Sequence, residues 1–121
     1  MKPVIYFLLM SVFFINCDKK QHVESITTLE LKELLATKNI QLMDVRTPEE
    51  IKEGFIETAV FANYFEEDFK TKASNQLDKS KTVYLYCRSG NRSEKAGVIL
   101  KEEGFNVIHV LGGFNQWEKE N

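Results

Sequence analysis

The sequence predicts an α/β fold in which helices cover both faces of a central parallel five-stranded sheet. Short apolar segments alternate with segments of helical periodicity from Val23 onward, and such alternation is typical of parallel sheets. The run "TVYLYC" (82–87) is almost continuously apolar, as expected of a strand that is covered on both sides. A length of 121 residues, with 43% hydrophobic and 28% charged residues, fits a single domain of this class.

The expected strands are short and apolar, and helix-forming patterns separate them. We place strands at residues 23–26, 40–45, 58–62, 82–87 and 106–111. We place helices after Thr27, after Thr47, over residues 64–73 and over residues 93–103.

Two of these helices begin with explicit start signals. Thr27 and Glu30 have the spacing of a capping box, in which each side chain binds the backbone N–H of the other residue. Thr47 and Glu50 repeat the pattern, and Pro48 occupies the first helical position, where proline is favoured. These signals place helix starts directly after the first two strands.

The N-terminal segment "MKPVIYFLLMSVFFINC" has the pattern of an export signal. Residues Val4–Ile15 are apolar except for Ser11, which matches the apolar region of a secretory signal peptide. A membrane-spanning helix needs about 20 apolar residues, so an uncleaved anchor would be short. The end of the segment, "FINC", resembles a bacterial lipobox, in which the cysteine is lipidated and becomes the new N-terminus.

These features predict three parts: a signal peptide (1–16), a polar tether (17–22) with Cys17 as the lipidation site, and one domain (23–121). The expected location is the periplasm or the outer surface of a bacterium, where the N-terminal lipid would anchor the protein to a membrane. Removal of Lys2 takes the net charge from −2 to −3, so nothing indicates a nucleic-acid partner. If Cys17 were not lipidated, it could instead form a disulfide with Cys87.

The stretch "YCRSGNRS" places Cys87 at the end of a buried strand, and ligand sites lie at the carboxyl ends of parallel strands. Gly90 allows positive φ, so backbone N–H groups can converge on one point, and the start of the next helix adds positive potential. We therefore expect an anion-binding loop. The residues assigned to it are Arg88, Ser89, Gly90, Asn91 and Arg92.

A thiol in such a loop is expected to ionise readily and to act as a nucleophile without a partnering base. The histidines are His22, in the tether, and His109, which we interpret as a structural strand residue, so a cysteine-histidine protease arrangement is poorly supported. Without a C-x-x-C motif, a dithiol oxidoreductase is not supported either. The alternative for Cys87 is a small packing residue at the end of a core strand.

The segments "DVRTPEEIKEGFIETAVFANY", "VYLYCRSGNRSEKAGVILKEEGF" and "VIHVLGGFNQW" together resemble a single-domain rhodanese. The resemblance covers nearly everything from Val23 to Trp117 and implies a three-layer fold around a parallel sheet. It also implies sulfur transfer through a persulfide on Cys87, with Arg88 to Arg92 as the active loop. The implied donor is a small sulfur-containing anion or a persulfide, the implied acceptor is a thiol or cyanide-like nucleophile, and no cofactor or metal is implied.

The same resemblance assigns supporting roles outside the loop. Asp44, Arg46 and Glu50 match the family's charged positions and are expected to form an ion-pair network that braces the site, although Glu50 could equally be a plain helix cap. "GGF" (112–114) resembles the turn into the last helix, and Trp117 is interpreted as a core residue. Phe55 stands where the family usually has histidine, which puts packing or substrate access in doubt.

Other functions remain open at this point. A non-catalytic persulfide carrier or sulfur sensor would use the same cysteine, and a binding module would use the fold without its chemistry. Phosphatases and arsenate reductases also combine a cysteine, an anion-binding loop and an arginine. Only four residues separate Cys87 from Arg92, one fewer than in protein tyrosine phosphatases, and this favours sulfur transfer over phosphoryl transfer.

Overall fold

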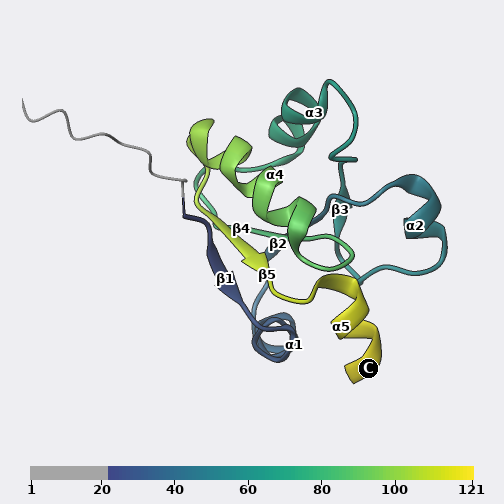
Figure 1. Ribbon diagram of the computed structural model, residues 1–121. Helices are drawn as coiled ribbons and strands as arrows, with labels where there is room; N and C mark the ends of the chain where they lie inside the picture. The colour runs from purple at the N-terminus through teal and green to yellow at the C-terminus, as the bar shows by residue number, and fades with distance from the viewer. Residues whose placement is uncertain (1–21) are drawn as a thin grey trace, which may run out of the picture.

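The structure, a computed structural model, describes residues 22–121, so the predicted signal peptide and Cys17 lie outside the described residues. A parallel five-stranded sheet with the order β1-β5-β4-β2-β3 forms its centre (Figure 1). The strands are β1 (Glu24–Ile26), β2 (Gln41–Asp44), β3 (Val60–Phe61), β4 (Val83–Tyr86) and β5 (Val107–Val110). The predicted fold class is confirmed.

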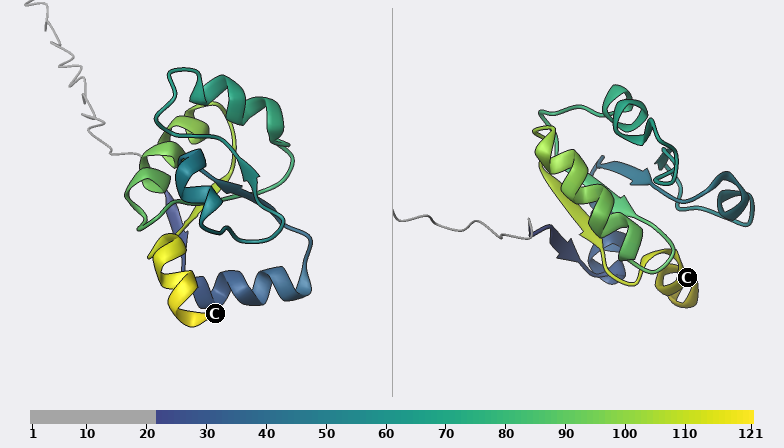
Figure 2. Two further views of the ribbon diagram at one scale, coloured as in Figure 1. Left: turned by 90° about the vertical axis from the view of Figure 1, so that its right-hand side faces the viewer. Right: turned by 45° about the horizontal axis from the view of Figure 1, so that its top comes forward.

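Helices lie on both faces of this sheet (Figure 2). They are α1 (Thr28–Thr37), α2 (Pro48–Lys52), α3 (Phe69–Gln76), α4 (Asn91–Glu102) and α5 (Gly113–Glu120). Helices α3 and α4 share one hydrophobic cluster with the sheet, and α1 and α5 share another on the opposite face. The short helix α2 lies near the β3 edge of the sheet (Figure 1).

Two helices begin where the local sequence predicts, and two others begin at a different residue from the predicted one. Both predicted capping boxes are present, at Thr27 and at Thr47. Helix α3 begins at Phe69 rather than at residue 64, because the Asn63 side chain accepts the N–H of Phe65 and residues 64–68 form turns instead. Helix α4 begins two residues earlier than expected, directly after Gly90.

One expected strand is also shorter than predicted. The segment 58–62 contributes only Val60–Phe61 to the sheet, since Thr58 has a φ of 73°, which is incompatible with an extended strand. Phe61 is exposed, in keeping with the edge position of β3. The edge strand β3, which pairs with β2, therefore has only two residues.

The two clusters that sandwich the sheet supply most of the apolar burial. Phe69, Ala73 and Leu100 lie in the cluster under α3 and α4, and Leu31 and Trp117 lie in the cluster under α1 and α5. A fully buried leucine contributes about 1.5 to 3 kcal/mol. Trp117 is only partly buried but packs against the second cluster, as its predicted core role requires.

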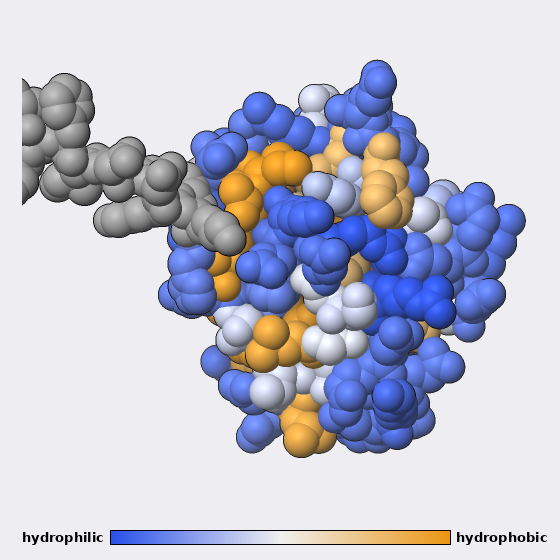
Figure 3. Space-filling model, viewed as in Figure 1, coloured by the Kyte–Doolittle hydropathy of each residue, from blue (hydrophilic) through white to orange (hydrophobic). Residues whose placement is uncertain are grey.

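The face of the molecule seen in Figure 3 is mostly hydrophilic, with separate apolar patches. Large apolar side chains that stay exposed are Leu29, Phe55, Phe61, Phe65 and Leu111. Within residues 22–121, none of the helices has the length and apolar character needed to cross a membrane.

Strand register determines which residues meet at the carboxyl edge of the sheet. Asp44, the last residue of β2, pairs with Tyr86, the last residue of β4, and Leu85 pairs with His109 of β5. Residues that follow β2 and β4 therefore leave the sheet side by side. Cys87 is the first residue after β4.

Candidate active site

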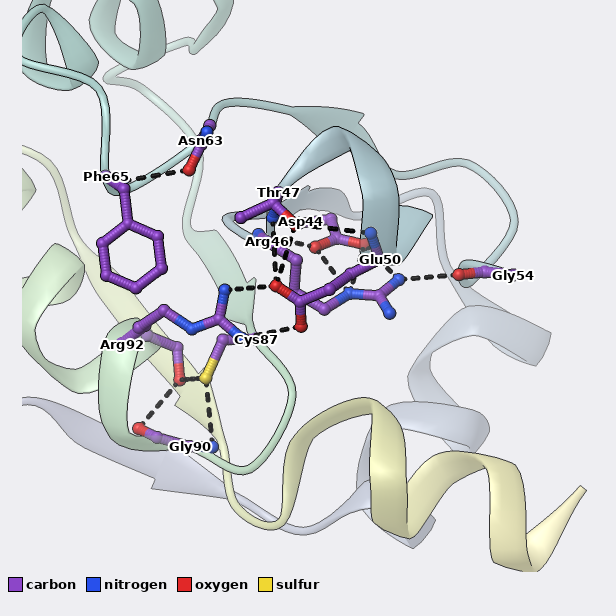
Figure 4. A network of polar contacts seen from close by, with 11 residues as sticks. Asp44, Arg46, Thr47, Glu50, Gly54, Asn63, Phe65, Cys87, Gly90 and Arg92 are labelled. Carbon is purple, nitrogen blue, oxygen red and sulfur yellow. Dashed lines mark hydrogen bonds and ion pairs between the residues drawn. The ribbon is translucent and has the colours of Figure 1, made fainter. Parts of the chain in front are cut away.

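Cys87 is a free cysteine at the carboxyl end of β4, and none of its surface is exposed. The backbone N–H of Gly90 donates to its Sγ at 3.1 Å, and the thiol lies 3.6 Å from the hydroxyl of Ser93 (Figure 4). Gly90 has a φ of 111°, which turns the chain back over the sulfur and starts α4. The sulfur thus lies at the N-terminus of α4, where the helix dipole favours negative charge.

The two arginines of the loop point to different partners. Arg92 donates to both carboxylate oxygens of Glu50, at 2.7 and 2.8 Å, and the ring of Phe65 lies over its guanidinium (Figure 4). The hydrogen bonds from Arg92 lower the pKa of Glu50 to about 2, and those to Glu50 raise the pKa of Arg92. Arg88 is exposed and lines a cavity beside the loop. Glu50 is both a helix-capping residue and an ion-pair partner.

Asp44 and Arg46 form a second, buried ion pair behind the loop. The guanidinium binds the Asp44 carboxylate through Nε and Nη2, with a shortest distance of 2.7 Å, and Nη2 also donates to the carbonyl of Gly54 at 2.7 Å. Burial opposes the charge of Arg46, but the Asp44 carboxylate outweighs it and raises the pKa of Arg46. The ring of Phe114 covers this guanidinium at 4.2 Å.

The N-terminus of α5 holds the loop from the other side. The N–H of Phe114 donates to the carbonyl of Cys87 at 2.8 Å, and the N–H of Asn115 donates to that of Arg88 at 3.0 Å. Gly113 comes so close that a Cβ there would lie 2.7 Å from the carbonyl oxygen of Arg88. The sequence predicts only a turn at "GGF". The paired glycines were the signal for this close approach.

A further contact links the loop to β5. Ser93 Oγ lies 3.1 Å from the carbonyl oxygen of Gly90 and 3.2 Å from Nδ1 of His109, as well as beside Cys87. His109 lies in β5, as expected, but its contact with Ser93 was not foreseen. The parallel pairing of β4 with β5 brings them together although 16 residues separate them in the chain.

The cavity beside the loop has a volume of about 460 Å³. Most of its lining residues are charged, with both signs present, and they come from the active loop, from α2 and the residues that flank it, and from α5: Arg46, Glu50, Glu53, Arg88, Phe114, Asn115, Glu118 and Lys119. Lys119, in the last turn of α5, is exposed and contributes to this lining. Within residues 22–121, no three potential metal ligands cluster together.

The structure thus separates the predicted loop residues into an inner part and an exposed side, and it places the two ion pairs beside the inner part. Cys87, Gly90 and Arg92 form the inner part of the loop, with the Asp44–Arg46 and Glu50–Arg92 pairs beside it. Arg88, Ser89 and Asn91 lie on its exposed side.

Phe55 does not contribute to this site. Its ring contacts that of Phe61 at 5.2 Å, and it lines a second cavity of about 470 Å³ together with Leu35, Ile56 and Trp117. The replacement of the usual histidine thus changes a surface away from the loop.

The sequence was compared with known protein families to identify the class of protein that has this loop. Residues 27–120 match the model of the rhodanese-like domain. The chain belongs to the rhodanese-like family.

Relatives of this rhodanese-like domain include named sulfurtransferases. "Putative sulfurtransferase YtwF" of Bacillus subtilis is 38% identical over 99 residues, which cover 81% of this chain and 93% of the relative. "Thiosulfate sulfurtransferase GlpE" of Coxiella burnetii is 31% identical over 97 residues, which cover 78% of this chain and 87% of the relative. A crystal structure of a rhodanese-like domain protein from Staphylococcus aureus has a TM-score of 0.72 and 35% identity, covering 78% of this chain and 91% of that one.

Proposed function

We propose that this protein is a sulfurtransferase that carries sulfane sulfur as a persulfide on Cys87. The observation that carries the proposal is the position of one free thiol at the end of the central strand, under the N–H of Gly90 and at the N-terminus of α4. The Glu50–Arg92 ion pair and the N-terminus of α5 bind the loop around it, and the buried Asp44–Arg46 pair lies nearby. Such preorganised donors stabilise negative charge without rearrangement during the reaction.

The proposed reaction has two steps, each balanced in charge. The Cys87 thiolate attacks the outer sulfur of thiosulfate, the sulfur–sulfur bond of the donor breaks, and sulfite leaves with the bonding electron pair. The product is a Cys87 persulfide anion, whose terminal sulfur takes the negative charge. An acceptor nucleophile, a thiolate or cyanide, then attacks that terminal sulfur and releases the Cys87 thiolate.

The surroundings of the thiol favour an anionic donor. Arg88 is exposed and belongs both to the loop and to the adjacent cavity, so its charge is available to an incoming anion. Arg92 is held by Glu50 and acts as a brace for the loop. Thiosulfate, a polysulfide or a persulfide donor all fit this arrangement.

Turnover of thiosulfate with cyanide tests the enzymatic part of the proposal. Steady release of thiocyanate by the wild-type protein, and its loss in Cys87→Ser, is the expected result. A protein that accepts sulfur once but does not turn over would instead be a non-catalytic carrier or sensor.

Phosphoryl transfer is the second reaction that such a loop can suggest, and two contacts oppose it. Arg92 is engaged by both oxygens of Glu50, so it is not available to bind a phosphoryl group. Asp44 is fully buried and bound to Arg46, so it cannot protonate a leaving group. We expect negligible hydrolysis of an aryl phosphate. Cys87-dependent hydrolysis at a rate comparable to sulfur transfer would overturn the assignment.

We further propose that the protein is exported and anchored to a membrane through a lipid on Cys17. The support is the apolar segment Val4–Ile15 followed by "FINC". Two lipid chains anchor a protein stably where one alone is marginal. Mass analysis of the protein from its native membrane should give a lipid-modified N-terminus at Cys17, whereas an unmodified chain that starts at Met1 would contradict the proposal.

A further inference from the structure

Three buried side chains form a continuous chain that leads away from the reactive sulfur. Cys87 Sγ lies 3.6 Å from Ser93 Oγ, and Ser93 Oγ lies 3.2 Å from Nδ1 of His109. Cys87 and Ser93 have no exposed surface, whereas 6% of His109 is exposed. His109 is thus the one member of this chain of three with any exposed surface, although it is still buried.

The hydrogen-bonding capacity of these groups allows a proton to pass along them. A thiol donates through its S–H, and a serine hydroxyl donates one proton and accepts others. When Cys87 is a thiol, its S–H donates to Ser93 Oγ, and in the tautomer that carries its proton on Nε2, His109 can accept the Ser93 hydroxyl at Nδ1. The carbonyl of Gly90, 3.1 Å from Ser93 Oγ, is the competing acceptor for that hydroxyl.

We propose that His109 is a positioning residue for sulfur transfer, which accepts the proton of Cys87 through Ser93. The proposal rests on the proposed role of Cys87 as the nucleophile. In the step, the Cys87 S–H proton moves to Ser93 Oγ while the Ser93 hydroxyl proton moves to His109 Nδ1. A thiolate and an imidazolium result, Ser93 is unchanged, and no other reactant is needed.

The surroundings of the imidazole act on it in both directions. Burial lowers the pKa of His109, which keeps the ring neutral at neutral pH and makes the imidazolium harder to form. Glu94 of α4 favours the imidazolium, and His22, ahead of β1, opposes it when charged. The thiolate formed at the other end of the chain also favours the imidazolium.

This link gives a buried thiol a route for its proton. The sulfur is enclosed by the loop, so direct contact with water requires the loop to open. A path through Ser93 and His109 allows the thiolate to form while the loop stays closed and Gly90 keeps its hydrogen bond to the sulfur. The thiolate would then already be present when the loop opens to admit a donor.

Alkylation of Cys87 by iodoacetamide, followed by mass spectrometry across pH, tests the relay without any sulfur transfer. In His109→Asn, the amide can still donate a hydrogen bond to Ser93 but cannot take up the proton. We expect the pH midpoint of alkylation to rise by about one unit, equivalent to about tenfold slower reaction below the midpoint. Ser93→Ala should give the same shift, and the double variant should add little to it.

Ser74→Ala is the matched control, because Ser74 also has a buried hydroxyl and its Oγ has no hydrogen-bond partner within residues 22–121. Its alkylation midpoint should equal that of the wild type. An unchanged midpoint in a folded His109→Asn variant would overturn the relay. Thiosulfate turnover, measured separately, would show whether the proposed function fails as well.

Titration of the His109 ring by NMR in the wild-type protein provides a test that does not depend on the folding of a His109 variant. Two sites linked by a shared proton titrate as a coupled pair. The His109 titration should therefore change when Cys87 is alkylated or replaced in Cys87→Ser. Identical titration curves in all three proteins would contradict the proposal.

Discussion

The ion pair between Glu50 and Arg92 joins α2 to the start of α4, and its removal should destabilise the protein. Glu50→Gln is the suitable change, because glutamine can keep the capping interaction with Thr47 while losing the charge. The pair has two hydrogen bonds, of 2.7 and 2.8 Å, and its side chains are only 19% and 16% exposed. It is therefore more strongly coupled than a typical surface ion pair.

The lowered pKa of Glu50 sets the size of the effect. A fall from 4.5 to about 2 corresponds to at most about 3 kcal/mol of stability at neutral pH. Partial exposure to solvent reduces that ceiling, so we expect Glu50→Gln to lower the free energy of unfolding by about 2 kcal/mol at pH 7. The fold should remain intact, because both hydrophobic clusters are untouched.

The pH dependence identifies the charge as the cause. A carboxylate with a lowered pKa in the folded protein contributes stability that is fully present above its unfolded value of 4.5 and is lost as the pH falls toward about 2. The difference between wild type and Glu50→Gln should thus be constant from pH 6 to pH 8, roughly, and shrink by more than half by about pH 3.

Urea unfolding at several pH values measures this difference. Glu53→Gln is the control, since Glu53 lies next to α2 and has no ion pair in the part of the chain that the structure describes. It should leave stability nearly unchanged. A Glu50→Gln effect below about 0.5 kcal/mol at pH 7, or one that does not shrink in acid, would refute the reasoning.

Three further predictions concern the loop and its support. Gly113→Ala should displace the active loop and sharply reduce sulfur transfer in the turnover assay, because the added methyl group meets the carbonyls of Cys87 and Arg88; unchanged turnover would contradict this close contact. Arg88→Ala should raise the KM for thiosulfate about two- to fivefold at low salt and leave an uncharged donor unaffected; equal effects on both donors would show that its charge is unused. Tyr86→Phe should cost about 1 to 3 kcal/mol in urea unfolding, since the Ile56 N–H loses its acceptor; an unchanged unfolding midpoint would argue against that hydrogen bond.

Local signals in the sequence predicted much of the fold. The two capping boxes and the apolar run of β4 depend on residues that are close in the chain, so their effects can be read without knowing the tertiary structure. The pattern of residues 64–68 is helical, yet the Asn63 side chain forms a competing turn there. Such competition has no clear signature in hydrophobic spacing.

Part of the site could also be predicted. The position of Cys87 follows from the apolar run of β4, which ends just before it. The position of Gly90 follows from the tight turn, which needs a residue with positive φ. The different partners of Arg88 and Arg92 are harder to predict, because Arg92 binds Glu50, which lies 42 residues away in the chain.

The contacts around Ser93 could not be predicted from the sequence. They depend on the strand order, which places β5 directly beside β4 and so brings His109 next to the first turn of α4. The same is true of the hydrogen bonds from α5 to the loop carbonyls, which need the whole sheet in place. Tertiary neighbours of this kind are set by topology, and an apolar pattern does not encode them.

The central claim is that Cys87 carries the transferred sulfur, and intact-mass analysis before and after exposure to thiosulfate tests it most directly. We predict a gain of one sulfur, about 32 Da, in the wild-type protein, removal of that mass by cyanide, and no gain in Cys87→Ser. An unchanged wild-type mass, or the same gain in Cys87→Ser, would contradict the account.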